Sequence, residues 1–397
     1  LLSTNLRLDS NSLQALQHDD DEDQVHHATT AYLNKQKARQ ENFKNLKGAT
    51  ETCVVCGDVA SGIWYSVWAC NGCKTFFRRV VIENRTYSCK RNGNCRIDKN
   101  MRCSCRHCRF RKCLKVGMDC AELNIERRRK KRCADLIREL VTREREFLKI
   151  LTSTNAPIHA SIREGLLNQS IFKNFQTYER NQMRPCDQMN FSYWRAKILS
   201  TVIEWAKSFD EFTQLSFEDQ QALIVHASFS NLVLSEAFHT PERYTDRIVF
   251  PDGLSGFRNL TANILKERSG LIPTVVAVIN GILVPIRRMR MTEIEYVLLQ
   301  AIIFFDPECL SLSESAINVI SNKRAAFLLS MRYHLETYMD KNESSHRFAA
   351  LLLRIPNVHK VAAFKRETLC TIETFNLMSP HPLTMEISKK YPDISFF

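Results

Sequence analysis

Eight cysteines in four closely spaced pairs constrain the fold of this 397-residue chain more than any other feature. Their spacing is Cys53-x2-Cys56-x13-Cys70-x2-Cys73, followed by Cys89-x5-Cys95-x9-Cys105-x2-Cys108. Zinc in structural sites binds four tetrahedral ligands, and four thiolates leave no position open for water. The spacing therefore predicts two structural zinc ions in one small module. An enzyme is the least expected class of protein, because closed sites hold no reactive water and no nucleophile–base pair stands out.

The distribution of the cysteines supports the same interpretation. Twelve of the fifteen lie between Cys53 and Cys133, whereas a secreted disulfide protein would spread them along the chain. The first ten residues lack the basic-then-apolar layout of a signal peptide. The sequence contains no run of about 18 apolar residues, so we expect no membrane span. These observations predict thiolates bound to metal in a reducing compartment.

Positive charge is concentrated in the same part of the chain. Residues 53–132 contain 20 Lys and Arg against 6 Asp and Glu, a net charge of +14, whereas the whole chain carries +13. The remainder of the chain is therefore close to neutral. A basic surface on a metal-bound framework favours a polyanionic partner, and a merely solvated surface would not concentrate charge in this way.

The residues after Cys70 predict a short amphipathic helix that docks on DNA. Within residues 71–79, Phe76 and Phe77 can pack inward, while Lys74 and Arg78 are four residues apart and share the outward face. A helix with such a face fits the major groove, where Arg and Lys can bind guanine. The alternative is a basic face that is only solvated.

The cysteine spacing, the CKTFFRR segment (residues 73–79) and the VGM segment (residues 116–118) resemble the DNA-binding domain of nuclear hormone receptors, over residues 51–132. The resemblance implies that the helix after the first zinc site enters the major groove and that the second site supports a dimer contact. It implies base contacts by Lys74, Arg78, Asn71 and Thr75. It implies phosphate contacts by Tyr65, Arg79, Arg102 and Arg109. It implies a dimer loop made of Lys90, Arg91, Asn92, Gly93 and Asn94.

Some residues depart from the family's usual pattern. Asn71 stands where Glu or Gly is usual, and Thr75 where Gly, Ala, Ser or Val is usual. These two positions choose the half-site, so no target sequence can be carried over. Cys103 is off register and is not expected to bind metal. Together with Trp64 and Arg106, these departures resemble the expanded nematode branch related to the hepatocyte nuclear factor type.

The second half of the chain predicts helices. From residue 134, apolar residues recur at intervals of three and four almost to the end. One strand signal is present in RIVFPDGL (residues 247–254), where Pro-Asp-Gly predicts a turn between two short strands. Residues 205–224 predict two helical pieces with a break near Leu215 and Ser216. They resemble the signature of the nuclear receptor ligand-binding domain, and RFAALLLRIP (residues 347–356) resembles its long tenth helix.

The resemblance also implies a groove that binds a coactivator or corepressor helix of LxxLL type. Lys207 and Glu386 match the Lys and Glu that hold the two ends of such a helix, where unpaired carbonyls and amides favour opposite charges. Ile203, Gln220 and Ile224 would line the groove. The alternative for Glu386 is an ordinary exposed carboxylate. A pocket for a small lipophilic ligand is implied as well.

The predicted fold is a small two-zinc α domain followed by an all-α helical-sandwich ligand-binding domain with a short β-hairpin. Residues 1–50 are predicted to be disordered, 51–126 to form the two-zinc DNA-binding domain, 127–134 a basic hinge, 135–388 the ligand-binding-type domain and 389–397 a C-terminal tail. The basic run predicts a nuclear localisation signal made of Arg127, Arg128, Arg129, Lys130, Lys131 and Arg132.

These features predict a sequence-specific transcription regulator in the nucleus that binds double-stranded DNA. The sequence leaves open whether it acts as a monomer, a homodimer or a heterodimer. Two alternatives stay open. One is a constitutive regulator with the same architecture and no ligand. The other is a zinc-scaffolded RNA-binding or adaptor protein, which is disfavoured because sequence-specific RNA-binding proteins more often offer aromatic stacking platforms.

Overall fold

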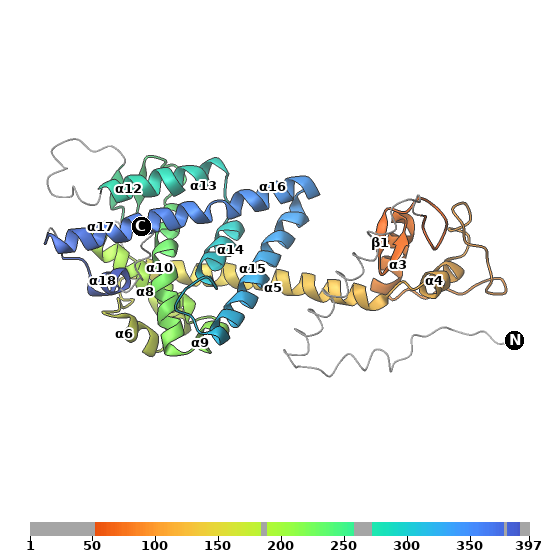
Figure 1. Cartoon of the computed structure of the whole chain (residues 1–397), viewed down its shortest axis with the longest axis horizontal. Coiled ribbons are helices and arrows are strands. Elements are labelled where there is room, and N and C mark those ends of the chain that lie inside the picture. The colour runs from red at the N-terminus through yellow and green to blue at the C-terminus, as the bar shows by residue number, and fades with distance from the viewer. Residues whose placement is uncertain (1–51, 184–188, 258–271, 377–378, 390–397) are drawn as a thin grey trace. The chain divides into compact units, whose positions relative to one another are not determined.

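The computed structural model describes residues 52–183, 189–257, 272–376 and 379–389 (Figure 1). The chain divides into two compact units, with the boundary between Arg129 and Lys130. The predicted disorder of residues 1–50 lies outside the described residues, as does the predicted tail beyond Lys389. None of the described helices is long and apolar enough to cross a membrane.

The first unit is a small α domain with one β-hairpin. β1 (Gly62–Trp64) pairs antiparallel with β2 (Val67–Ala69). Both turn residues, Tyr65 and Ser66, have positive φ angles of 55° and 72°, which suit the twist of a two-residue hairpin. The sequence predicts no strands here, because strands of three residues are too short to show an alternating pattern. α3 (Asn71–Ile82) and α4 (Arg106–Lys115) complete the arrangement.

The core of this unit combines the cysteines with a few large apolar side chains. Phe77 is fully buried, and its ring centroid lies 5.2 Å from that of Tyr65 and 5.8 Å from that of Phe110. Val80 and Met118 are buried as well. Because a core of this size supplies little stability by apolar burial, we expect metal binding to supply much of it.

α5 (Cys120–Leu151) crosses the boundary between the units. It contains the segment predicted as a basic hinge, residues 127–134, which is therefore helical.

The second unit is built from helices and one small hairpin, as predicted. Among the described residues, its helices after the end of α5 are α6 (Ile162–Leu167), η1 (Ile171–Asn174), α7 (Phe175–Glu179), α8 (Phe191–Ala206), α9 (Asp210–Thr213), α10 (Phe217–Phe238), α12 (Ile272–Val278), η2 (Ile279–Leu283), α13 (Val284–Arg288), α14 (Glu293–Phe304), α15 (Glu314–Tyr338), α16 (Lys341–Leu352), α17 (Ile355–Thr374) and α18 (Pro382–Lys389).

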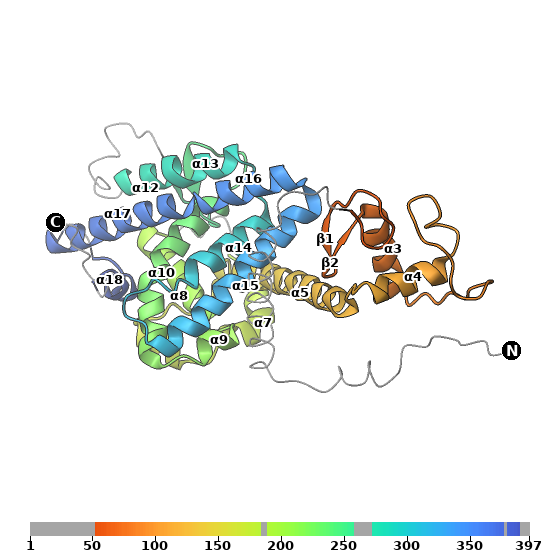
Figure 2. The ribbon, with the colours of Figure 1, turned by 45° about the vertical axis from the view of Figure 1, so that its right-hand side comes forward.

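α10 forms the centre of the second unit. It packs against α8, α14 and α17, and Figure 2 shows it surrounded by the other helices of the unit. Most of its residues are buried around the whole circumference, including small and polar ones such as Ser228 and Asn231. A helix that is buried on all sides belongs to the middle layer of a helical sandwich.

The predicted hairpin is present in the second unit. β3 (Arg247–Val249) pairs antiparallel with β4 (Ser255–Phe257), and Gly253 in the turn has a φ of 84°. Asp252, fully buried in the same turn, accepts a hydrogen bond of 2.9 Å from the indole N–H of Trp194 on α8. The turn that the sequence predicts is therefore also the point at which the hairpin is anchored to the helices.

Two helix boundaries bear on the sequence predictions. The predicted break near Leu215 and Ser216 is confirmed, because α9 ends at Thr213 and α10 begins at Phe217. The segment that resembles one long tenth helix is divided instead, since α16 ends at Leu352 and α17 begins at Ile355. Pro356 lies in the first turn of α17, where the absence of a backbone N–H costs no hydrogen bond.

Candidate zinc centres, DNA-binding helix and helix groove

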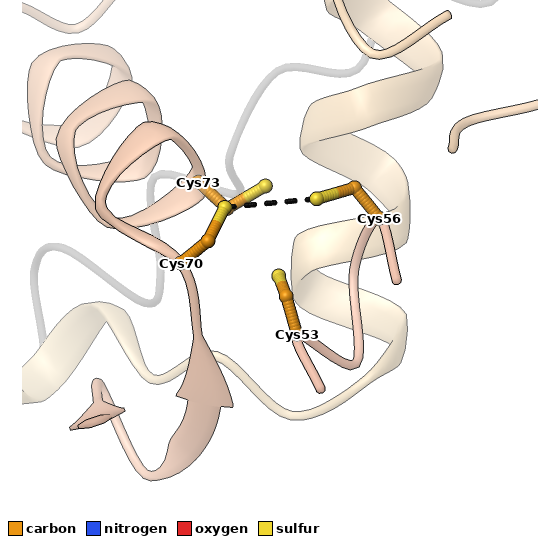
Figure 3. A group of neighbouring side chains, drawn as sticks. All are labelled: Cys53, Cys56, Cys70 and Cys73. Carbon is orange, nitrogen blue, oxygen red and sulfur yellow. Dashed lines mark hydrogen bonds between the residues drawn. The ribbon is translucent and has the colours of Figure 1, made fainter. Parts of the chain in front are cut away.

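The first cysteine group forms a closed tetrad. Cys53 and Cys56 lie in the loop before β1, Cys70 is the residue that precedes α3, and Cys73 lies in the first turn of α3. All four are buried and their sulfur atoms lie within 4.8 Å of one another, so that the thiols point toward a common centre (Figure 3). The sulfurs of Cys56 and Cys70 are 3.6 Å apart. Sulfurs bound tetrahedrally to zinc, each at about 2.3 Å from the metal, would be about 3.8 Å apart, so the tetrad fits zinc.

The second group forms a similar tetrad from Cys89, Cys95, Cys105 and Cys108. The sulfur of Cys89 lies 3.7 Å from the sulfur of each of the other three. The backbone N–H of Arg91 donates to this sulfur at 3.3 Å, and the hydrogen bond lowers the pKa of Cys89 to about 6. Both predicted ligand sets are thus confirmed as tetrads that suit two structural zinc ions. Cys103 is exposed and belongs to neither tetrad.

Two arginines surround the sulfurs of the first tetrad. Arg102 donates from Nη1 to the carboxylate of Asp58 at 2.8 Å and to the sulfur of Cys70 at 3.3 Å. Arg109 is buried and donates from Nη2 to the sulfur of Cys73 at 3.3 Å. Cationic donors beside a thiolate stabilise its charge and fix its orientation on the metal. The sequence does not predict this role, because 36 residues separate Arg109 from Cys73.

α3 presents the predicted DNA contacts on the side opposite its buried residues. Asn71, Thr75, Arg78 and Arg79 are exposed. Lys74 is partly buried because its ammonium nitrogen lies 2.9 Å from the centroid of the Trp64 ring, a cation–π contact. The predicted amphipathic helix is therefore present.

The other predicted DNA, dimer and localisation residues differ in exposure. Tyr65 is buried against Phe77. In the predicted dimer loop, Gly93 has a φ of 74° and its four neighbours are exposed, namely Lys90, Arg91, Asn92 and Asn94. The basic run at 127–132 lies on α5 and is exposed except for Lys130, which is partly buried. The roles of all these residues stay predictions.

In the helical unit, α6 lies between Lys207 and Glu386. The ammonium group of Lys207 donates to the carbonyl oxygens of Gly165 and Asn168 at the C-terminal end of α6, and Glu386 accepts from the backbone N–H of Ile162 at the N-terminal end. Of the other predicted groove residues, Ile203 and Ile224 are fully buried. Gln220 donates to the carbonyl oxygens of Phe212 and Leu215 at the end of α9.

Comparison with known proteins identifies the family of each of the two units. Residues 51–120 match the double treble clef zinc finger of C4 type, and residues 176–375 match the ligand-binding domain of nuclear hormone receptor. The chain belongs to the nuclear hormone receptor family. The receptor is therefore a DNA-binding transcription regulator with a ligand-binding domain, as the sequence predicts.

Several curated relatives resemble this receptor over most of their length. Nuclear hormone receptor family member nhr-1 of Caenorhabditis elegans is 28% identical over 388 residues, which cover 86% of this chain and 84% of the relative. Member nhr-10 of the same organism is 29% identical, with 84% and 93% covered. The retinoic acid receptor RXR of Biomphalaria glabrata is 29% identical, with 78% and 66% covered. The relation to the hepatocyte nuclear factor type stays a prediction.

Glu204 is a buried residue beside Lys207 that sequence reasoning missed. Its carboxylate is fully buried and accepts from the ammonium of Lys207 at 2.6 Å, from His159 at 2.8 Å and from the backbone N–H of Ile171 at 2.9 Å. The sequence signal that could have revealed this residue is a carboxylate in the apolar stretch of α8, three residues before Lys207. A charge buried there needs a partner, and Lys207 is within reach.

A second set of buried charges in the receptor was also missed. Arg195 on α8 is 3% exposed, and burial lowers its pKa to about 10. Glu236 on α10 and Lys365 on α17 are buried as an ion pair. The three side chains carry one net positive charge in the interior of the domain, and periodicity alone does not reveal this because each residue fits its own helix.

Proposed function

We propose that the receptor binds a DNA half-site through α3 and regulates transcription in the nucleus. The observation that supports this proposal most directly is the construction of α3. Cys73 in its first turn is one ligand of the first metal site, and Cys70, the residue before the helix, is another. Phe77 in the middle of the helix is buried in the core. These anchors leave Arg78 and Arg79 exposed on a helix whose rotation is set by the core. A rigid helix with exposed cations is suited to the major groove.

Two single substitutions test this proposal. Lys74→Ala should cost about 1–3 kcal/mol on the preferred sequence and relax the sequence preference, because a base contact is lost. Arg79→Ala should weaken binding to all sequences alike and reduce the salt dependence by about one phosphate contact. The measurement is a binding-site selection from random duplex DNA, followed by titration of the selected and a scrambled duplex.

Lys341→Ala is the matched control, since it removes one exposed positive charge from α16 in the helical unit. It should leave both titrations unchanged. Equal effects of Lys74→Ala and Arg79→Ala on every duplex would contradict the assigned roles. The selection also reports whether one half-site or two spaced half-sites are preferred, and with it whether the receptor binds alone as a monomer or as a homodimer through the dimer loop at residues 90–94.

We further propose that the groove of α8, α10 and α18 binds a coactivator or corepressor helix of LxxLL type, and that a small lipophilic ligand controls this binding. The positions of Lys207 and Glu386 at the two ends of one short helix support the first part. Three further roles belong to the same proposal. Residues 127–132 serve nuclear import. The phosphates of the DNA are contacted by Tyr65, Arg79, Arg102 and Arg109. The receptor has no catalytic role.

A further inference from the structure

The strongest unassigned feature of the receptor is the way α6 is held at both ends. The backbone N–H of Ile162, its first residue, donates to the Glu386 carboxylate at 2.8 Å. The ammonium of Lys207 donates to the carbonyl oxygens of Gly165 at 2.7 Å and Asn168 at 2.9 Å. The first amides and last carbonyls of a helix have no hydrogen-bond partners within the helix. The carboxylate of Glu386 and the ammonium of Lys207 therefore supply hydrogen bonds that these end groups would otherwise lack.

The contact face of α6 is apolar and closely fitted. Ile162 and Gly165 are buried, whereas Arg163 and Glu164 are exposed. A Cβ atom on Gly165 would lie 3.0 Å from a ring carbon of His159 and 3.2 Å from two carbon atoms of Ile203, so a larger residue here would require these side chains to shift. α6 packs on α8, α10 and α18 together. It is thus a short amphipathic helix in a groove between three helices.

We propose that α6 is an intramolecular occupant of the partner groove, and that an amphipathic partner helix binds the receptor only by displacing it. The same Lys207 and Glu386 cannot hold the ends of two helices at once. This inference rests on the proposed binding of an LxxLL helix, because the competition requires a partner that uses the same two charges.

The fold around α6 favours displacement over permanent docking. The helix has six residues and contains Gly165, so it is marginal without the groove. On its N-terminal side, His159 donates from its backbone N–H to Ser200 and pairs with Glu204. On its C-terminal side, Ile171 also bonds to Glu204. α6 therefore lies on a segment fixed near both ends, so that it can leave the groove while His159 and Ile171 stay bonded to Ser200 and Glu204.

The tether also explains how so short a helix can compete. A segment held next to its site has a local concentration of about the millimolar range, without any gain in contacts. A free partner binds only the receptors whose groove is open. Its apparent affinity is therefore its affinity for the open groove multiplied by the fraction of receptors in that state.

Ile162→Ser tests the proposal in the full-length, zinc-loaded receptor. It removes the buried apolar anchor of α6 and leaves Lys207 and Glu386 in place. We expect a fluorescent helical LxxLL peptide to bind this variant about tenfold more tightly than the unchanged receptor, measured by anisotropy. Leu167→Ser is the matched control, because Leu167 on the same helix is 64% exposed, and its affinity should stay that of the unchanged receptor.

Hydrogen exchange of the unchanged receptor gives a second test that needs no variant. The amides of Gly165 and Asn168 are bonded within α6, and saturating peptide should make them exchange faster. Equal peptide affinity of Ile162→Ser and the unchanged receptor would overturn the proposal. Peptide binding without faster exchange in α6 would do the same. Peptide binding to no variant would instead reject the proposed LxxLL function, and the competition with it.

Discussion

At the scale of single residues, Arg195 differs from Glu204, Lys207, Glu236 and Lys365, the other buried charges of the helical domain described above. Glu204 and Lys207 satisfy each other, and so do Glu236 and Lys365. Two nitrogens of Arg195, Nε and Nη2, are buried and have no hydrogen-bond partner among the described residues. Burial lowers its pKa, and Glu236 acts in the opposite direction. Such a charge costs free energy in the folded domain.

We expect Arg195→Met to stabilise the ligand-free receptor against urea by about 1–3 kcal/mol, because Met keeps the apolar stem and removes the desolvated charge. Lys365→Met should instead destabilise it by about 3 kcal/mol or more, since Glu236 is then left buried without its partner. Unfolding followed by far-ultraviolet circular dichroism measures both changes. A loss of stability in Arg195→Met as large as in Lys365→Met would show that Arg195 has a partner of its own.

At the scale of elements, the two short helices of the first unit both begin at metal ligands. α3 has 12 residues and follows Cys70, and α4 has 10 residues and follows Cys105. Neither preceding cysteine makes a side-chain hydrogen bond to its helix, so the usual N-terminal cap is lacking. Helices of this length are marginal in water on their own. The metal therefore fixes the start of both helices.

Removal of zinc should unfold α3 and α4 and abolish DNA binding, because structural zinc contributes about 10–16 kcal/mol to the folding of such modules. Cys70→Ser and Cys105→Ser should each lose metal and the same helical signal, as measured by metal content and circular dichroism. Cys103→Ser is the matched control, since Cys103 is exposed and outside both tetrads. Retention of the helices after complete chelation would contradict this role of the metal.

Among the elements of the helical domain, the hairpin could be predicted from the sequence and α6 could not. The hairpin could be predicted over residues 247–254 because Pro251 and Gly253 specify a turn locally, and the structure places its second strand at residues 255–257. α6 was not predicted, because a helix of six residues spans too few turns to show a period. Its position depends on three other helices and on two charges far along the chain, and a local pattern contains none of these.

At the scale of the whole molecule, DNA binding and partner-helix binding belong to domains of different net charge. Residues 53–132 carry a net charge of +14 and the whole chain +13, so the ligand-binding domain is close to neutral. Binding to DNA releases condensed counterions in proportion to the phosphates contacted, whereas apolar binding in a groove does not. The two interactions of one receptor should therefore respond differently to salt.

An increase in salt from about 50 to 200 mM should lower the affinity for duplex DNA by about 10³-fold or more if six or more phosphates are contacted. The affinity of the Ile162→Ser receptor for the LxxLL peptide should change by about threefold at most, because only one charged side chain contacts each end of the helix and it bonds to neutral backbone groups. Both titrations can be made on one preparation. Equal salt dependence of the two would contradict the separation.

The sequence by itself determined the eight metal ligands, the amphipathic helix at residues 71–79, the concentration of charge and the helical class of the second half. Each of these depends on residues close together in the chain, where spacing and periodicity act directly. Only the tertiary structure decided which partners the charged side chains find. Arg109 lies against Cys73 across 36 residues, and Glu386 holds Ile162 across 224. Such contacts depend on how whole helices pack, and packing is the joint result of many side chains, so no local pattern records it.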